Sequence, residues 1–158
     1  MEIERKFLVP ALPPDLEKHP SAVIDQGYLA SSPEGVEVRV RRKGEDCFLT
    51  VKHGANLSRT EVELPLAHAQ FDELWPLTAG RRVRKIRYDL PGPGGLTVEL
   101  DVYSEALAGL QTADVEFPDE EAAHDFLLPD FLGKEITGNA AYRNERLARE
   151  GLPGDGKP

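Results

Sequence analysis

Charged residues of both signs alternate with apolar residues in seven stretches of this sequence, and this spacing is the feature best suited to chemistry. In the first stretch, E-I-E-R-K at residues 2–6, an extended strand places Glu2, Glu4 and Lys6 on one side and Ile3 on the other. The other six stretches are VEVRVRR at 36–42, FLTVKH at 48–53, RTEVEL at 59–64, VRKIRY at 83–88, TVELDVY at 97–103 and DVEF at 114–117. Strands of this kind give a sheet one aliphatic face and one face that carries acids and bases together.

Such a charged face has a definite chemistry. Clustered carboxylates bind Mg²⁺ or Mn²⁺ through oxygen. Clustered arginine and lysine bind phosphate, and arginine does so with two parallel hydrogen bonds. The combination predicts a polyanionic phosphate substrate, which a divalent metal links to the acids while polarising a phosphoryl group and positioning water.

The alternating pattern alone does not decide whether this charged face lies outside the sheet or inside a barrel. A solvated outer face with ion pairs is the ordinary interpretation of any single strand. Repetition over seven strands favours the interior of a closed barrel that holds water, metal and an anionic ligand.

The elements that must position these residues are mostly strands. Alternation predicts eight of them, at residues 2–9, 22–30, 36–43, 47–53, 59–64, 82–90, 96–103 and 113–117. Helical spacing or a capping residue predicts helices at 67–75, at 120–128 after Asp119 and at 140–149 after Asn139. The predicted fold class is therefore α+β, an eight-stranded antiparallel β-barrel with a few helices packed outside.

The segment PGPGG at 91–95 predicts a hairpin loop. If residues 90 and 96 flank this loop, Arg87 lies opposite Glu99 and Lys85 lies opposite Asp101, so that opposite charges pair across the two strands. We expect Arg5, Arg42, Lys43, Arg82 and Arg84, on the opposite face or at a strand end, to be solvated.

Length and composition limit the classes of protein that fit. The 158 residues are enough for one domain, which we place at 1–150, and the tail at 151–158 is expected to be disordered. The net charge of −9 disfavours a nucleic-acid partner. No apolar stretch is long enough to span a membrane, and the N-terminus is charged. The single cysteine, Cys47, excludes an internal disulfide, so a cytoplasmic location is expected.

Other catalytic motifs are missing from the sequence. PGPGG lacks the spacing of a P-loop, no HExxH is present, and the four histidines are scattered. Cys47 has no paired histidine signature, which disfavours a cysteine nucleophile.

The motif ExExK at residues 2–6, followed by an ordered series of segments, resembles the CYTH superfamily, the triphosphate tunnel metalloenzymes. The resemblance runs from residue 2 to about residue 149, and it is closest to the short, single-domain bacterial inorganic triphosphatases. The segments are QGYL at 26–29, VRVR at 38–41, LTVK at 49–52, RTEVE at 59–63, KIRY at 85–88, VELDVY at 98–103 and DVEF at 114–117.

The resemblance implies a tunnel lined by charged side chains and a role for each of them. It implies metal ligation by Glu2, Glu4 and Glu116, with Asp114 as a further ligand at the position where the family often has a second glutamate, and Glu61, Glu63, Glu99 and Asp101 as further acids around metal or water. It implies a phosphate clamp made of Lys6, Arg39, Arg41, Lys52, Arg59, Lys85, Arg87 and Lys134. Lys6, Lys85 and Tyr28 are the catalytic candidates, and the Tyr28 hydroxyl contacts phosphate or orders water unless the side chain is only a packing group.

We therefore predict an Mg²⁺- or Mn²⁺-dependent hydrolase that splits inorganic tripolyphosphate into pyrophosphate and phosphate. The same fold leaves three alternatives open: a class IV adenylate cyclase, a thiamine or nucleoside triphosphatase, and a module that binds polyphosphate without cleaving it. A homodimer is compatible with the last predicted helix, which borders either a tunnel mouth or a second subunit.

Overall fold

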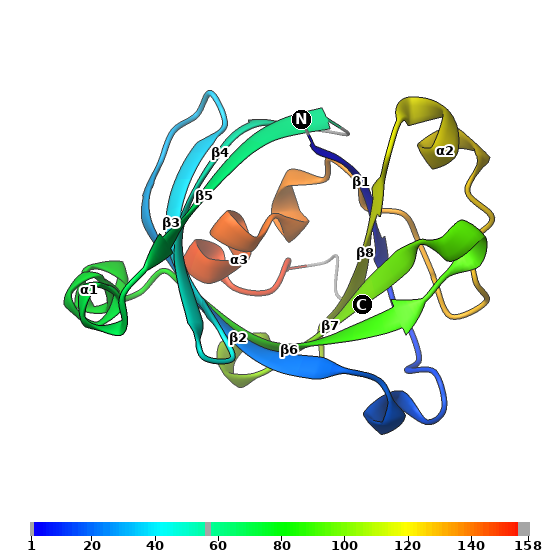
Figure 1. Cartoon of the computed structure of the whole chain (residues 1–158), viewed down its shortest axis with the longest axis horizontal. Helices are drawn as coiled ribbons and strands as arrows, with labels where there is room; N and C mark the ends of the chain where they lie inside the picture. The colour runs from blue at the N-terminus through cyan, green and yellow to red at the C-terminus, as the bar shows by residue number, and fades with distance from the viewer. Residues whose placement is uncertain (1, 56–57, 155–158) are drawn as a thin grey trace.

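The structure, a computed structural model, describes residues 2–55 and 58–154, except for the side chains of Glu2, Ala55 and Ser58. Within these residues, eight antiparallel strands close into a barrel in the order β1-β5-β4-β3-β2-β6-β7-β8 (Figure 1). The strands are β1 (Glu2–Leu8), β2 (Ser21–Ser31), β3 (Val36–Lys43), β4 (Asp46–Ala55), β5 (Ser58–Leu66), β6 (Arg82–Pro91), β7 (Thr97–Tyr103) and β8 (Gln111–Phe117). The predicted fold is confirmed.

The helices are short. They are α1 (His68–Leu74), α2 (Glu120–Asp125) and α3 (Asn144–Glu150), with 3-10 turns at η1 (Leu16–Lys18), η2 (Trp75–Thr78), η3 (Pro93–Gly95), η4 (Glu105–Leu107) and η5 (Ala140–Tyr142). Figure 1 shows α1 and α2 outside the barrel, on different sides of it. In the described part of the chain no helix has the length and apolar character needed to cross a membrane.

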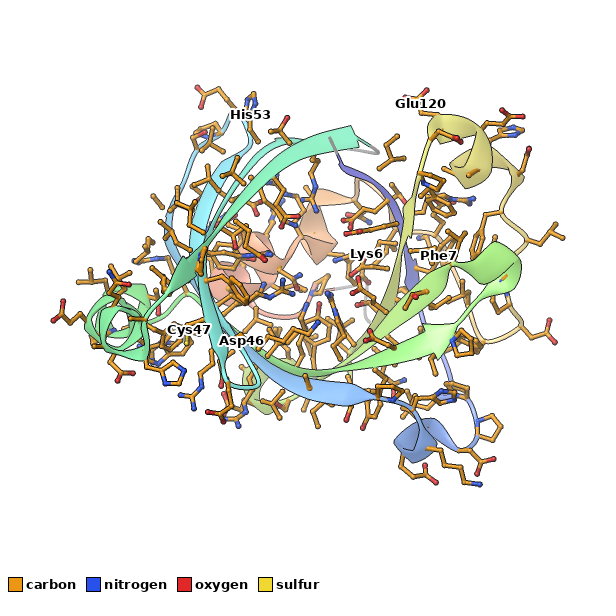
Figure 2. The ribbon with its side chains drawn as sticks, in the orientation of Figure 1. Lys6, Phe7, Asp46, Cys47, His53 and Glu120 are labelled. Atoms are coloured by element: carbon orange, nitrogen blue, oxygen red, sulfur yellow. The ribbon has the colours of Figure 1, made fainter. Side chains whose placement is uncertain are left out.

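Apolar side chains pack in three clusters, because charged groups take up much of the barrel interior. The largest cluster covers the outer face of β1, β7 and β8 beneath α2, and includes Phe7 and Phe126. A second lies around Phe71 beneath α1, and a third joins Tyr103 to Leu147 of α3. Figure 2 shows the alternation within one strand: Lys6 points into the barrel and Phe7 points away from it.

The barrel closes along a short seam between β1 and β5. Two residue pairs, Glu2–Arg59 and Ile3–Ser58, join these strands in the described part. Farther along, the segment 133–137 takes the free edge of β1 and forms backbone hydrogen bonds with it. This edge of β1 is therefore occupied by a segment that follows the last strand by more than a dozen residues.

Arg5 fastens this segment to β1, so the expectation that it is solvated is wrong. Its guanidinium makes a two-pronged ion pair with Glu135, at 2.6 and 2.9 Å, and donates to the Ala123 carbonyl at 2.7 Å. The neighbouring Lys6 N–H donates to Thr137 Oγ1 at 2.9 Å. The strand that carries ExExK is thus held on its outer side by residues distant in sequence.

The β6–β7 hairpin has a different register from the predicted one. Pro91 pairs with Thr97, which places Arg87 opposite Asp101 and Lys85 opposite Tyr103. A tight loop joins the two strands, and a 2.7 Å hydrogen bond from the N–H of residue 92 to the carbonyl of residue 96 closes it. The loop is centred one residue later than predicted, and this moves each facing pair by two positions.

Two predicted helices also differ from the observed ones. α2 ends at Asp125 instead of residue 128, because Phe126 becomes extended and packs against the first apolar cluster. The predicted helix at 140–149 is divided: Asn139 caps η5, at 3.1 Å from the Ala141 N–H, and Arg143 is extended before α3 begins. Residues 155–158 of the predicted disordered tail lie outside the described residues.

Candidate active site

Two adjoining cavities, of about 170 and 210 Å³, occupy the barrel. The first, which we call the end cavity, is bordered by residues 136–144 and by Tyr28. The second, the central cavity, is lined almost entirely by charged side chains. Its lining contains the bases Lys6, Arg39, Arg41, Lys43, Lys52, Arg59, Lys85 and Arg87, and the acids Glu4, Glu61, Glu63, Glu99, Asp114 and Glu116.

The two signs of charge lie mainly on different walls. Strands β3, β4 and β6 contribute bases to the central cavity, whereas β7 and β8 contribute acids. Strands β1 and β5 contribute both. Because β7 and β8 are separated from β3 and β4 in the barrel order, the site has a basic wall and an acidic wall with space between them.

On the basic wall, buried guanidinium groups retain unused hydrogen-bonding capacity. Arg39 is only 4% exposed and lies 3.6 Å from Glu61, yet its Nε has no hydrogen-bond partner in the described part. The buried Nε of Arg41 is also without one. Burial, together with the nearby Arg39 and Arg87, lowers the pKa of Arg41 to about 10. An incoming anion would relieve this concentration of positive charge.

Asp101 lies at the centre of a buried ion-pair network. Its two oxygens accept hydrogen bonds from Arg87 at 2.8 and 2.9 Å, and Lys85 Nζ lies 2.8 Å from Oδ2. Burial alone would raise the pKa of Asp101, but the two cations lower it well below its usual range. Since both oxygens are engaged, the geometry favours a structural counter-ion over a metal ligand.

Replacing Asp101 with asparagine is expected to destabilise the fold. The D101N variant removes the counter-charge that Arg87 and Lys85 share, and it leaves Arg87 only its longer contacts with Glu99 and Asp114, both at 3.4 Å. We expect a cost of about 3–5 kcal/mol of the free energy of unfolding. Urea unfolding followed by circular dichroism measures this loss. The matched control is D25N, which removes a partly exposed partner of Arg84 at 3.7 Å and should cost less than about 1 kcal/mol. Equal losses in the two variants would contradict the structural role of Asp101.

Lys85 is a buried lysine whose pKa lies close to neutral pH. Burial lowers its pKa, Asp101 raises it, and Arg87, Arg41 and Lys6 lower it further, to about 7. Its ammonium also lies 5.5 Å from the centre of the Tyr103 ring. The charge on Lys85 therefore responds to any anion that enters the cavity.

The acidic wall brings carboxylates together on neighbouring strands. Glu4 of β1 lies opposite Glu116 of β8, and Asp114 lies opposite Glu99 of β7. Burial raises the pKa of Glu99; Arg87 opposes that shift, and Asp114 is among the acids that add to it. Like charges held this closely favour a bound cation.

The donor set of this wall fits a divalent metal. Its groups are carboxylate oxygens, which Mg²⁺ and Mn²⁺ prefer. A cation would remove the repulsion that the neighbouring acids add to the effect of burial on the pKa of Glu99. No ready-made group of three metal-binding side chains exists among the residues that the structure describes. The predicted ligand Glu2 has its backbone in β1, but its side chain lies outside the described residues.

The structure brings most of the predicted site residues into one interior, with two departures. The Lys134 side chain is exposed and lines neither cavity. Its backbone carbonyl accepts a hydrogen bond from the Leu8 N–H. Asp101 is enclosed by its cations, as described above. Lys43, expected to be solvated, lines the central cavity because it continues the inward face of β3.

Sequence reasoning missed three polar residues of the interior. Glu37 is buried in the end cavity and is ion-paired with Arg143, which reaches it from the turn before α3. Glu37 could have been found, since it shares the inward face of Arg39. Gln26 is fully buried beside Tyr28. Nothing local in the sequence marks Arg143, because its position depends on the break between η5 and α3.

A closed antiparallel barrel whose interior has a basic wall facing an acidic wall defines the class of charged-tunnel barrels. The family model of the CYTH domain matches residues 1–138, and the chain belongs to this family.

Relatives extend the match over nearly the whole chain. An inorganic triphosphatase of Nitrosomonas europaea is 44% identical over 147 residues, covering 93% of this chain and 96% of the relative. One of Acetivibrio thermocellus is 33% identical over 152 residues, covering 94% and 93%. A crystal structure of an inorganic triphosphatase superposes with a TM-score of 0.73 at 39% identity, covering 98% of this chain and 97% of that one. The chain is accordingly an enzyme.

Proposed function

We propose that this protein hydrolyses inorganic tripolyphosphate to pyrophosphate and phosphate inside the barrel, with Mg²⁺ or Mn²⁺ as cofactor. The observation that carries the proposal is the pair of facing walls: buried guanidinium groups with unused donors on one side, and crowded carboxylates on the other. The two full-length relatives, both named inorganic triphosphatase, support the same substrate class.

The bases act as a clamp along the phosphate chain. Arg39, Lys52, Arg59 and Lys6 line both cavities, so they reach a ligand that extends from one into the other. Burial makes each of these contacts stronger than it would be in water. Tyr28 presents a phenol to the end cavity, where it donates a hydrogen bond to a phosphate oxygen.

The acids supply the other half of the site. Glu4, Glu116 and Glu2 are the proposed metal-holding residues, with Asp114 and Glu99 adjacent to them on β8 and β7. When bound, the metal offsets phosphate charge and polarises the phosphoryl group. A carboxylate of the acidic wall orients water in line with the terminal phosphorus, and no side-chain nucleophile is needed.

The direct test measures phosphate and pyrophosphate release from tripolyphosphate, ATP, thiamine triphosphate and pyrophosphate, each with Mg²⁺, Mn²⁺ or EDTA. Fast, metal-dependent cleavage of tripolyphosphate over the other substrates is expected. Cyclic AMP among the ATP products would assign the chain to the cyclases instead. No turnover, with tripolyphosphate still raising the melting temperature, would leave a binding module and refute hydrolysis.

Binding of tripolyphosphate should take up a proton at Lys85. This lysine, with a pKa of about 7, is mostly neutral at about pH 8, and an adjacent polyanion raises its pKa and returns its charge. Near pH 6 the group is already protonated, so the uptake disappears. Titration calorimetry in buffers of different ionisation enthalpy, with EDTA present, gives the proton count.

The control for this measurement is K85R, because arginine keeps its charge throughout the range. Subtracting the proton count of K85R from that of the wild type cancels the protons that the substrate itself gains or loses. Identical proton counts at pH 8 would contradict the depressed pKa of Lys85.

Several expectations on cellular context remain predictions. A lone, buried Cys47 suits a reducing compartment, and we expect a cytoplasmic location. The acidic net charge disfavours nucleic acid as a partner. A homodimer remains to be tested by sedimentation.

A further inference from the structure

Gln26 is a polar residue with no role in the site described so far. It is fully buried on β2 and lines neither cavity. Its side-chain Nε2 lies 2.9 Å from Tyr28 Oη, two residues along the same face of the strand. An amide placed behind a cavity-lining phenol can control which way the hydroxyl points.

The rest of Tyr28 is already fixed. Its N–H donates to the Arg81 carbonyl at 3.0 Å, and its own carbonyl accepts from Arg81 Nε at 3.0 Å. Gly27 packs so closely on Thr78 that a Cβ there would lie 2.4 Å from Oγ1, which locks this turn of β2 against η2. With backbone and ring held, rotation of the hydroxyl is the remaining freedom of Tyr28.

The neighbours of Gln26 set the direction of its amide. Gln26 lies directly opposite Arg41 of β3 on one side and Val83 of β6 on the other. Arg41 offers only donors, so the amide oxygen is favoured toward it and the NH₂ group toward Tyr28. In the structure Nε2 lies on the Tyr28 side and donates to Oη, while Oε1 has no hydrogen-bond partner among the described residues.

Because Tyr28 Oη accepts from Gln26, the phenol proton must point elsewhere. Burial raises the pKa of Tyr28 and keeps the phenol protonated at neutral pH, while Arg39 opposes that shift through its positive charge and through a hydrogen bond with the Tyr28 side chain. The end cavity is the direction left for this proton, and a phosphate oxygen there is a ready acceptor.

We propose that Gln26 is a positioning residue that turns the hydroxyl proton of Tyr28 toward the bound triphosphate. This inference rests on the proposed function for the identity of the acceptor. The contact between Gln26 and Tyr28 does not depend on it, and the two can be tested separately.

The activity test uses two substitutions with opposite chemistry. Gln26→Met keeps the volume and removes the donor, so the hydroxyl is no longer directed; kcat for tripolyphosphate should fall about 10-fold with little change in KM. Gln26→Glu offers a carboxylate that captures the phenol proton, so kcat should fall as far as in Tyr28→Phe. Ile24→Met, a buried change on the same face of β2, is the packing control and should alter kcat less than about twofold.

A double-mutant cycle separates positioning from general damage. In the Tyr28→Phe background there is no hydroxyl to direct, so Gln26→Met should lower kcat no further. An equal fall in both backgrounds would overturn the proposal, as would a Gln26→Glu variant with wild-type kcat.

A substrate-free measurement completes the test. A fluorinated tyrosine at position 28 ionises at lower pH than tyrosine, and its absorbance reports its pKa. Loss of a donor to the oxygen raises that pKa, so Gln26→Met should shift the titration upward. A downward shift would mean that the amide accepts from Tyr28, and would refute the proposal. If the shift is upward but wild type does not cleave tripolyphosphate, the contact stands and the proposed function fails.

Discussion

Replacing Arg39 with methionine is expected to lower kcat/KM for tripolyphosphate about 100-fold or more, the loss typical of one preorganised electrostatic contact. Arg39 is nearly inaccessible to solvent, lines both cavities and has an Nε without a partner in the described part. Steady-state phosphate release, with the metal held at saturation, measures the effect.

Arg39→Lys is the matched variant, since it keeps the charge and loses the two-pronged geometry; it should fall between wild type and R39M. Stability must be followed in parallel by thermal unfolding. Glu61 retains Lys52 at 3.6 Å after the substitution, so the fold should survive. A folded R39M enzyme with more than about a tenth of wild-type kcat/KM would remove Arg39 from the phosphate clamp.

Replacing Glu116 or Glu4 with glutamine should weaken the binding of the metal. Each change removes one carboxylate charge from the pair that faces across β1 and β8. We expect at least a 10-fold rise in the Mg²⁺ concentration that gives half-maximal activity, about the loss seen when metal sites are disturbed. EDTA should abolish turnover altogether. Mn²⁺ binding, followed by electron paramagnetic resonance without substrate, gives a measure independent of catalysis.

Glu120→Gln is the control for this experiment, because Glu120 is exposed at the start of α2, outside the barrel (Figure 2). It should leave both metal binding and activity unchanged. Full activity of Glu4→Gln at limiting metal would show that the metal site has been assigned to the wrong wall.

The strands and their inward faces could be predicted because alternation is a local property. The inward charged residues of β3, for example, follow from the position of Arg39 by steps of two. The β6–β7 register could not be fixed in the same way. It depends on where a glycine-rich loop turns, and a shift of one residue in the loop centre places Asp101 instead of Glu99 directly opposite Arg87.

Long-range contacts were the other limit. Lys134 was predicted to point into the tunnel, yet its segment serves as an edge partner of β1 and leaves the side chain in solvent. Arg143 enters the interior only because the C-terminal helix breaks before Asn144. Gln26 stands in a predicted strand, but its importance depends on the polarity of one hydrogen bond, which no spacing rule conveys.

Two of the three apolar clusters are separate from the charged lumen, and this has a consequence for how this protein can change. Packing of Phe7 or Phe71 lies on the outer surface of the sheet, whereas the charges of Lys6 or Arg39 lie on its inner surface. Groups without shared neighbours contribute almost independently to the free energy of unfolding. Outside the ion-pair network of Asp101, the lumen can therefore accept new charge patterns, and with them new anionic ligands, while the outer clusters continue to hold the barrel closed.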